Sequence, residues 1–117
     1  YKQKQVLVQL SSKDFSFVGE GLTAEVYRFF EALKFKPNLT QNTAISILCV
    51  VDDHPEKVKE FCHACAEHFD VQVTKDLILL TIRHYNEKIV AELSGDKPII
   101  LKQQTPETIQ ILLKAVV

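Results

Sequence analysis

The fold expected for this chain is decided by Val6-Leu7-Val8-Gln9-Leu10-Ser11-Ser12 and, beyond a loop rich in Ser and Gly, by Gly21-Leu22-Thr23-Ala24-Glu25-Val26-Tyr27. Residues 5–11 are largely apolar and rich in branched side chains, which predicts a strand. From residue 22 to residue 33, apolar side chains recur at helical spacing with charged side chains on the opposite side, which predicts an amphipathic helix. Pro37 is expected to end this helix, because the residue before a proline resists the helical conformation.

Strands and a second helix are expected downstream of this pair. Residues 38–42 are short and polar and predict an irregular strand, and residues 44–51 predict an apolar, central strand. Asp52-Asp53-His54-Pro55 then predicts a helix start, with an acidic cap and a proline in the first turn. A further strand is expected at residues 71–74. The side chains expected to face the core from the second helix are Val58, Phe61, Cys62, Cys65 and Phe69.

The order of these elements is β-α-β-β-α-β, which predicts an α+β fold of the ferredoxin-like kind over residues 1–75, with both helices on one face of the sheet. A second round of elements follows at once. It comprises a strand at 77–82, a short helix at 87–93, and strands at 98–102 and 108–113. Residues 76–117 are therefore expected to form a truncated β-α-β-β unit, packed with the first unit as one domain.

The charge and composition of the chain exclude some classes of binding partner. Its 117 residues carry 14 basic and 15 acidic side chains, well mixed, for a formal charge of −1. This surface lacks the one-signed field that nucleic acid or an anionic membrane requires, so neither is expected as a partner. The longest apolar stretch, residues 44–51, is too short to span a bilayer, and no targeting segment is recognised. The 3 cysteines are too few for a disulfide framework, which favours a reducing cytoplasm.

Gly19-Glu20-Gly21-Leu22-Thr23-Ala24 fits the G-x-G-x-x-A pattern of dinucleotide-binding turns. In that pattern the first glycine directly follows a strand, whereas a long loop separates Leu10 from Gly19 here, so a dinucleotide site is not expected. The glycines still precede a helix, where free backbone N–H groups and the helix dipole favour a carboxylate or phosphate. A site for a small anionic or zwitterionic ligand and a plain flexible loop both fit this pattern.

Cys62-His63-Ala64-Cys65, with His68 nearby, has a spacing seen in metal and redox sites. Zinc needs four converging ligands, and no second ligand pair lies elsewhere in the chain. A redox pair of cysteines usually lies at a helix start, whereas this pair is expected in the middle of a helix. We therefore expect two core cysteines and no metal site.

Catalytic motifs are not evident in the sequence. Asp52, Asp53 and His54 could form an acid–base cluster, but at a strand-to-helix turn a helix cap explains them more simply. His84-Tyr85-Asn86 is expected to end a strand. The sequence contains no G-x-x-x-x-G-K-[ST] loop, no G-x-S-x-G elbow and no H-E-x-x-H helix. We expect neither a catalytic residue nor a cofactor in this chain.

Residues 6–12 and 21–27 resemble the opening of the first ACT unit in aspartate kinases. Residues 38–47 resemble the strand pair that follows in that family, and residues 99–104 through 109–113 resemble strands of its second unit. The resemblance covers nearly the whole chain. It implies the regulatory region of an aspartate kinase, an enzyme of amino-acid biosynthesis that phosphorylates aspartate with ATP.

The resemblance also implies a binding site and partners. ACT units of this family form a homodimer and bind an amino-acid effector, here of the lysine or threonine class. A kinase domain that holds ATP and Mg would precede Tyr1 in the same polypeptide. Helix-start N–H groups would take the effector's carboxylate, and side-chain and backbone oxygens would take its ammonium group. The resemblance implies that the effector lies between the first strand–helix loop of one unit and the second strand of a partner unit. The effector-binding residues implied are Phe15, Ser16, Phe17, Gly21 and Leu22 on the loop side and Asn38, Gln41, Asn42 and Thr43 on the strand side.

Three other functions stay open at this point. The chain fits an ACT-type ligand-binding or dimerisation module of another amino-acid enzyme or of a transcriptional regulator. It also fits a small enzyme with a ferredoxin-like fold, which would need a cleft holding a strongly perturbed acid or base. A structural role, with dimerisation and no ligand, is the third.

Overall fold

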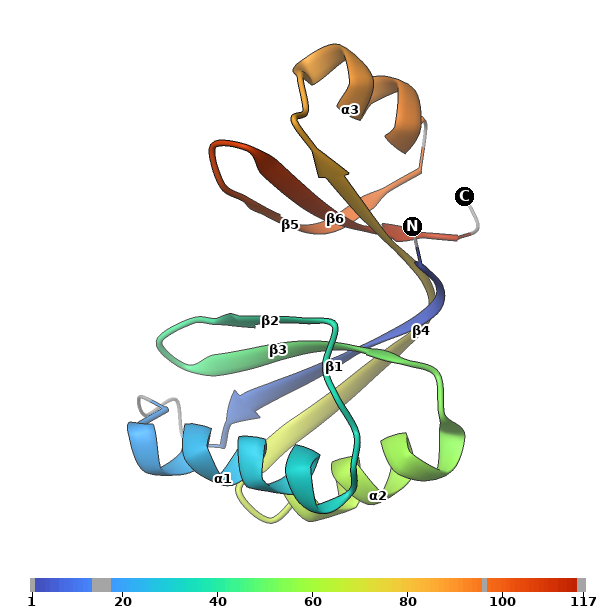
Figure 1. The fold of residues 1–117 in the computed structure, drawn as a ribbon. Helices are drawn as coiled ribbons and strands as arrows, with labels where there is room; N and C mark the ends of the chain where they lie inside the picture. Colours follow the sequence, from blue (N-terminus) through green and yellow to red (C-terminus); the bar gives the residue numbers. More distant parts are fainter. Residues whose placement is uncertain (1, 14–17, 96, 116–117) are drawn as a thin grey trace. The chain divides into compact units, whose positions relative to one another are not determined.

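The computed structural model of the chain describes residues 2–13, 18–95 and 97–115. The described residues form six strands and three helices (Figure 1). In chain order these are β1 Lys2–Ser12, α1 Glu20–Ala32, β2 Leu39–Asn42, β3 Ser46–Asp52, α2 Pro55–Cys65, β4 Phe69–Arg83, α3 Glu87–Ser94, β5 Ile99–Gln104 and β6 Thr108–Lys114. The expected α+β fold and the β-α-β-β-α-β order of the first six elements are confirmed.

The chain divides into two compact units. The N-terminal unit is Val6–Lys75, and the C-terminal unit comprises the described parts of residues 1–5 and 76–117. Both boundaries fall inside strands, so β1 and β4 contribute residues to each unit. The hydrogen-bonded strand order is β2-β3-β1-β4 in the N-terminal unit, and in the C-terminal unit it runs from β4 through β6 to β5.

The two helices of the N-terminal unit, α1 and α2, lie side by side on one face of its sheet (Figure 1). Every second residue of a strand points to the same face, and the alternate residues of β1 and β3 accordingly form the floor of the core. These floor residues are Val6, Val8, Leu10, Ile47, Cys49 and Val51. The helices cover them with Val26, Phe30, Val58, Phe61 and Cys65. The apolar faces of the two helices and of the sheet therefore pack together in a single core.

An aromatic stack joins the two helices. The rings of Phe30 on α1 and Phe61 on α2 are stacked with their centroids 4.3 Å apart. Phe35 meets the edge of the Phe61 ring at a centroid distance of 6.3 Å and lies 5.9 Å from the Phe30 ring. All three side chains are buried. This cluster fixes where the C-terminal end of α1 sits on the sheet.

The end of α1 differs from the expected end at Pro37. The helix stops at Ala32, because the next residues form a Schellman turn. Lys34 adopts a left-handed conformation with φ of 52°, and the backbone N–H of Lys34 donates to the carbonyl oxygen of Glu31 at 3.1 Å. The N–H of Phe35 donates to the carbonyl oxygen of Phe30 at 2.9 Å, which turns the Phe35 side chain into the core.

The start of α2 agrees with the prediction, but its cap residue and its C-terminal end do not. His54, not an acidic residue, occupies the N-cap position, and it makes no side-chain cap hydrogen bond, although Pro55 opens the helix as expected. The helix ends at Cys65, so Phe69 does not belong to its apolar stripe. Phe69 is the first residue of β4 and is buried in the same core.

The strands predicted at residues 71–74 and 77–82 are one continuous strand, β4. Asp76 takes a left-handed conformation with φ of 60° inside this strand, where it passes from one unit to the other. Aspartate tolerates this conformation better than most residues. The polar pair Lys75-Asp76 therefore marks an irregularity within a strand, not a turn between two strands.

The C-terminal unit contains α3 and an antiparallel group of strands. β6 pairs with β4, with Leu79 opposite Leu112, and on its other side with β5, with Gln103 opposite Gln110. The strand predicted from residue 98 begins at Ile99, and its register shifts between Ile99 and Leu101. The buried core of this unit includes Leu80, Ile82, Ile109, Ile111 and Leu113.

Replacing Lys34 by glycine should stabilise the protein by about 1 kcal/mol, because glycine adopts the left-handed conformation of a Schellman turn without strain. The midpoint of urea unfolding measures this change. Lys36→Gly, two residues on and outside the left-handed region, is the matched control and should give no gain. A Lys34→Gly variant no more stable than the wild type would contradict this account of the helix end.

Candidate functional site

Two residues of the predicted effector site lie in the first turn of α1. Gly21 is exposed, and a Cβ atom built on it would meet no heavy atom within 4 Å, so the space beside this turn is open. Leu22 is half-buried and packs against the core of the N-terminal unit. No side chain caps α1 at its N-cap residue, Gly19. Because the first N–H groups of a helix have no partner within it, this turn suits an anionic group. The predicted residues Phe15, Ser16 and Phe17 lie outside the described residues.

The turn between β2 and β3 lies against the segment that leads into α1. The backbone N–H of Val18 donates to the carbonyl oxygen of Ala44 at 2.9 Å, and the N–H of Ser12 donates to that of Ile45 at 2.8 Å. These two bonds hold both ends of the β1–α1 loop to one turn. Thr43 stiffens that turn, since its hydroxyl lies 2.6 Å from the Ser46 hydroxyl.

The structure therefore brings part of the predicted site together. Gln41 and Asn42 are the last two residues of β2 and are at least partly exposed, and Thr43 follows them in the turn. They lie at the same end of the N-terminal unit as Gly21 and Leu22, because the β2–β3 turn is bonded to the β1–α1 loop. We call the described residues 18–22 and 41–46 the α1-start surface.

Asn38 does not belong to the α1-start surface. It precedes the other end of β2, where its N–H donates to the carbonyl oxygen of Val50 at 2.7 Å and its side-chain amide donates to Asp52 Oδ1 at 2.9 Å. An extended strand rises about 3.3 Å per residue, which puts Asn38 about 13 Å from Asn42. A single small ligand therefore does not contact Asn38 and the α1-start surface of the same protomer.

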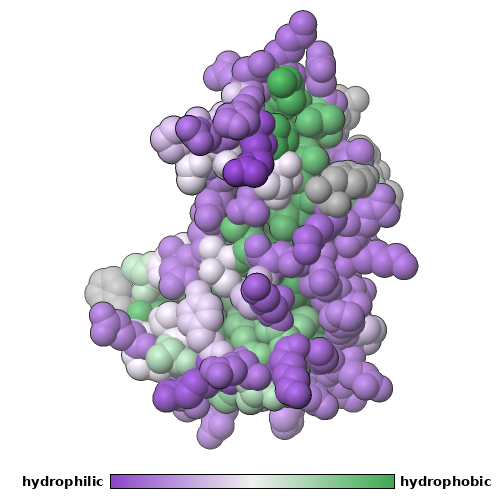
Figure 2. Space-filling model, viewed as in Figure 1, coloured by the Kyte–Doolittle hydropathy of each residue, from purple (hydrophilic) through white to green (hydrophobic). Residues whose placement is uncertain are grey.

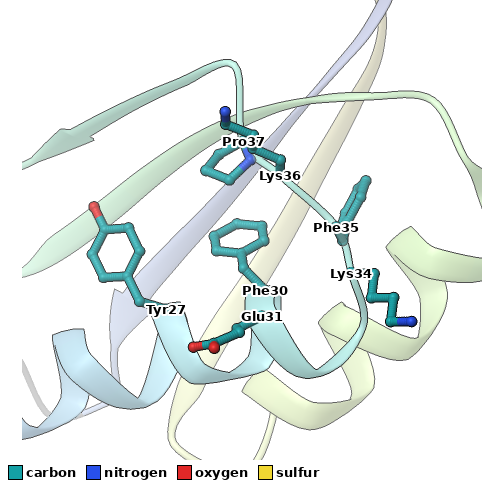
Figure 3. Close-up of a pocket in the computed structure, with 7 residues that line it drawn as sticks. All are labelled: Tyr27, Phe30, Glu31, Lys34, Phe35, Lys36 and Pro37. Carbon is teal, nitrogen blue, oxygen red and sulfur yellow. The ribbon is translucent and has the colours of Figure 1, made fainter.

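A concavity at the C-terminal end of α1 was not expected from the sequence. It has a volume of about 300 Å³ and is formed by the last turns of the helix and the Schellman turn (Figure 3). Phe30 and Pro37 lie at its centre, and Tyr27 flanks it with its hydroxyl 3.2 Å from that of Thr40. The charged side chains at its rim belong to Glu31, Lys34 and Lys36. The left-handed turn at Lys34 shapes this concavity, and the hydrophobic periodicity of the sequence gives no sign of that turn.

The three residues considered as an acid–base cluster have different surroundings. The Asp52 carboxylate accepts the hydrogen bond from Asn38, and the His54 ring lies edge-on to Phe35 at 6.3 Å. Asp53 Oδ1 is buried and has no hydrogen-bond partner among the described atoms.

The cysteines lie where core residues lie. Cys49 on β3 and Cys65 on α2 are fully buried, and Cys62 is half-buried against the same core. The Cys62–Cys65 pair is in the last turn of α2, not in the middle of the helix as expected. Burial, and secondarily the neighbouring thiols, raises the pKa of Cys49 to about 12, and burial with the Cys62 thiol raises the pKa of Cys65 to about 12. Protonated thiols are poor nucleophiles and poor metal ligands.

Two other kinds of feature, metal-binding side-chain clusters and membrane-spanning helices, are absent from the described residues. No group of three or more His, Cys, Asp or Glu side chains in residues 2–13, 18–95 and 97–115 is arranged to hold a metal ion. Within the same residues, no helix has the length and apolar character needed to cross a membrane.

Comparison with known proteins gives relatives only at the level of structure. No protein-family model matches the sequence, and no curated protein matches it. A candidate C-terminal regulatory domain of aspartate kinase from Porphyromonas gingivalis has the same fold, with a TM-score of 0.80 and 16% identity over 97% of this chain and 83% of that chain. The regulatory subunit of aspartate kinase from Thermus thermophilus gives 0.71 and 12% identity over 97% of this chain and 85% of that chain.

The chain has the fold of an aspartate kinase regulatory domain. E. coli aspartokinase III, in complex with lysine and aspartate, also contains it, with a TM-score of 0.75 and 15% identity over 97% of this chain. The chain spans 28% of the length of that enzyme. At these identities the comparison establishes the fold, which confirms the architecture that the sequence resemblance implied.

The reactivity of the thiols tests whether Cys49 and Cys65 are buried in the native protein. In the native protein Cys49 and Cys65 should react with iodoacetamide far more slowly than in the unfolded chain throughout pH 7 to pH 9, because burial and a pKa of about 12 leave little thiolate in that range. In urea the rates should rise steeply with pH, as they do for free thiols. Mass spectrometry of alkylated peptides measures each site, with half-buried Cys62 as the internal comparison. Native-state labelling of Cys49 or Cys65 at the rate of the unfolded chain would contradict the buried assignment.

Proposed function

We propose that this chain is the regulatory ACT region of an aspartate kinase, and that it binds an amino-acid effector and takes no part in the chemistry of phosphoryl transfer. The observation that carries this proposal is the fold shared with aspartate kinase regulatory domains over nearly the whole chain. The resemblance of residues 5–52 to the family's first ACT unit supports it independently. Fold alone does not determine function, so effector binding has to be argued from the chemistry of the α1-start surface.

The α1-start surface has the chemistry that an amino-acid ligand needs. The open first turn of α1 offers backbone N–H groups to a carboxylate, and Gly21 leaves room for a close approach. The side chains of Gln41 and Asn42 add amide oxygens that accept hydrogen bonds from an ammonium group. Both are on β2, which is last in the strand order of the sheet, so a second copy of the chain can approach them.

A homodimer completes this proposal. Asn38 lies too far from the α1-start surface of its own protomer to share its ligand, and in a dimer it serves the site of the partner. The effector then stabilises whichever dimer arrangement it binds more tightly, and a kinase domain in the same polypeptide responds to that shift in population. ATP and Mg belong to that kinase domain. The complex of E. coli aspartokinase III with lysine makes lysine the first effector to test, with threonine beside it.

A ligand screen tests the proposal directly. Thermal unfolding of the chain is measured with lysine, threonine, methionine, aspartate and S-adenosylmethionine, and any hit is titrated by calorimetry. A ligand that binds only the folded state raises the melting temperature by mass action. We expect one amino acid to do so.

Matched variants locate the effect. Gln41→Ala with Asn42→Ala should weaken binding at least tenfold, whereas Gln72→Ala, at an exposed glutamine on β4, should leave it unchanged. Gly21→Ala should fold normally, because a Cβ has open space there, and should weaken binding by crowding the ligand. Absence of any stabilising ligand would overturn the effector proposal and leave a structural dimerisation module.

A further inference from the structure

The concavity at the C-terminal end of α1 has no part in the proposed effector site. It lies at the opposite end of the helix from the α1-start surface, and all of its lining residues belong to the N-terminal unit. An apolar cavity of about 150 Å³ can hold a benzene ring. The volume of about 300 Å³ in this concavity therefore suits one aromatic ring that carries a substituent.

The walls of the concavity are aromatic and apolar. Phe30 and Pro37 lie at its centre, and the Tyr27 ring flanks them (Figure 3). Tyr27 is 42% exposed, which leaves much of its ring open to a ligand. Its hydroxyl lies 3.2 Å from that of Thr40, and this contact holds the ring in place. A planar ligand ring can pack here against two aromatic side chains, which favours an aromatic ligand over an aliphatic one.

Several backbone carbonyl groups at this end of α1 already have hydrogen-bond partners. Those of Phe30 and Glu31 accept from N–H groups of the Schellman turn, and that of Lys34 accepts from Lys57 Nζ at 3.0 Å. Carbonyl groups without partners at the C-terminus of a helix attract cations. Because these three are paired, the charged side chains at the rim decide which ligand the concavity prefers.

The rim of the concavity is positively charged overall. Lys34 and Lys36 both line it and are exposed, and Glu31 is the acidic residue among those that line it. Lys57 adds a further positive charge beside Lys34. Among the described residues, the side chains of Lys34, Lys36 and Glu31 take part in no ion pair. An anionic ligand group complements this rim, and a cationic one does not.

The positive and negative parts of the rim lie on different sides of the concavity. The Lys36 side chain runs past the Pro37 ring, whereas the Glu31 carboxylate lies on the other side of the Phe30 ring (Figure 3). Figure 2 shows hydrophobic surface between strongly hydrophilic groups over the helices of the N-terminal unit. A ligand ring that lies against Pro37 can therefore direct an anionic group to Lys36 and away from Glu31.

We propose that this concavity binds a small aromatic anion, a single ring that carries a carboxylate or phosphate group. The ring packs over Phe30 between Tyr27 and Pro37. The Lys36 ammonium group donates to the anionic group, and Lys34 strengthens the positive potential there. The ligand needs no α-amino group, because an ammonium group would be repelled by the same lysines. The site lies outside the α1-start surface, and either site can fail without the other.

Amide NMR titration of the full chain tests this proposal, with phenylacetate and phenyl phosphate as probes. Shifts of residues 27–36 should move in a saturable way with at least one probe, and the tighter of the two identifies the anionic group. Benzyl alcohol lacks the charge and should bind about threefold more weakly, and benzylamine, which carries the opposite charge, about tenfold more weakly. Added salt should weaken the binding of phenylacetate and leave that of benzyl alcohol unchanged.

Exposed positions supply the variants. Lys36→Gln should weaken phenylacetate about threefold and leave benzyl alcohol unchanged, whereas Lys59→Gln, exposed on α2 and outside the concavity, should change neither. Glu31→Gln should strengthen phenylacetate about twofold, because it removes a like charge. Tyr27→Ala should weaken both probes about tenfold, because it removes the ring against which they pack.

An amino-acid probe separates this site from an effector site. Phenylalanine should bind the concavity more weakly than 3-phenylpropionate, which has the same ring and carboxylate and lacks the ammonium group.

Three results would overturn the proposal. One is the absence of a saturable shift in residues 27–36 with both anionic probes. Another is binding of benzyl alcohol or benzylamine as tight as that of the anions, which would show a ring pocket that does not recognise charge. The third is unchanged phenylacetate affinity in either Lys36→Gln or Tyr27→Ala.

Discussion

The stack of Phe30 on Phe61 is the contact from which the geometry of the N-terminal unit follows. Each ring buries apolar surface that contributes about 1.5–3 kcal/mol, and the ring pair adds about 0.5–1.5 kcal/mol. The stack fixes α1 beside α2 over the floor formed by β1 and β3. Because the helix is held there, its two ends are presented at fixed places on the surface.

These two ends differ in chemistry. At the first end, an N-cap glycine and an open helix turn meet the β2–β3 turn, an arrangement suited to a carboxylate. At the other end, the Schellman turn closes the helix and forms the aromatic concavity of Figure 3. A helix rises about 1.5 Å per residue, so these places lie about 18 Å apart and cannot share one small ligand. Asn38 lies near the second end.

Sequence patterns predicted most elements of the fold. Residues 22–33 bury one face at helical spacing, whereas residues 5–11 and 44–51 are largely apolar runs whose strands bury side chains on both faces of the sheet. The patterns did not reveal backbone turns made by single residues. Left-handed Lys34 ended α1 early, and left-handed Asp76 lies inside β4, which the sequence predicted as two separate strands. The sequence pattern also did not show that Asn38 lies at the opposite end of β2 from Asn42, because the pattern identifies the strand and not which of its ends meets the β1–α1 loop.

The claim that the α1-start surface binds the effector can be tested most directly by an amide NMR titration of the whole chain with lysine and, separately, threonine. The account predicts that one of them moves the amide shifts of residues 18–22 and 41–46 in a saturable way, with smaller changes elsewhere. Saturable shifts confined to other residues, or no saturable shift with either amino acid, would contradict it.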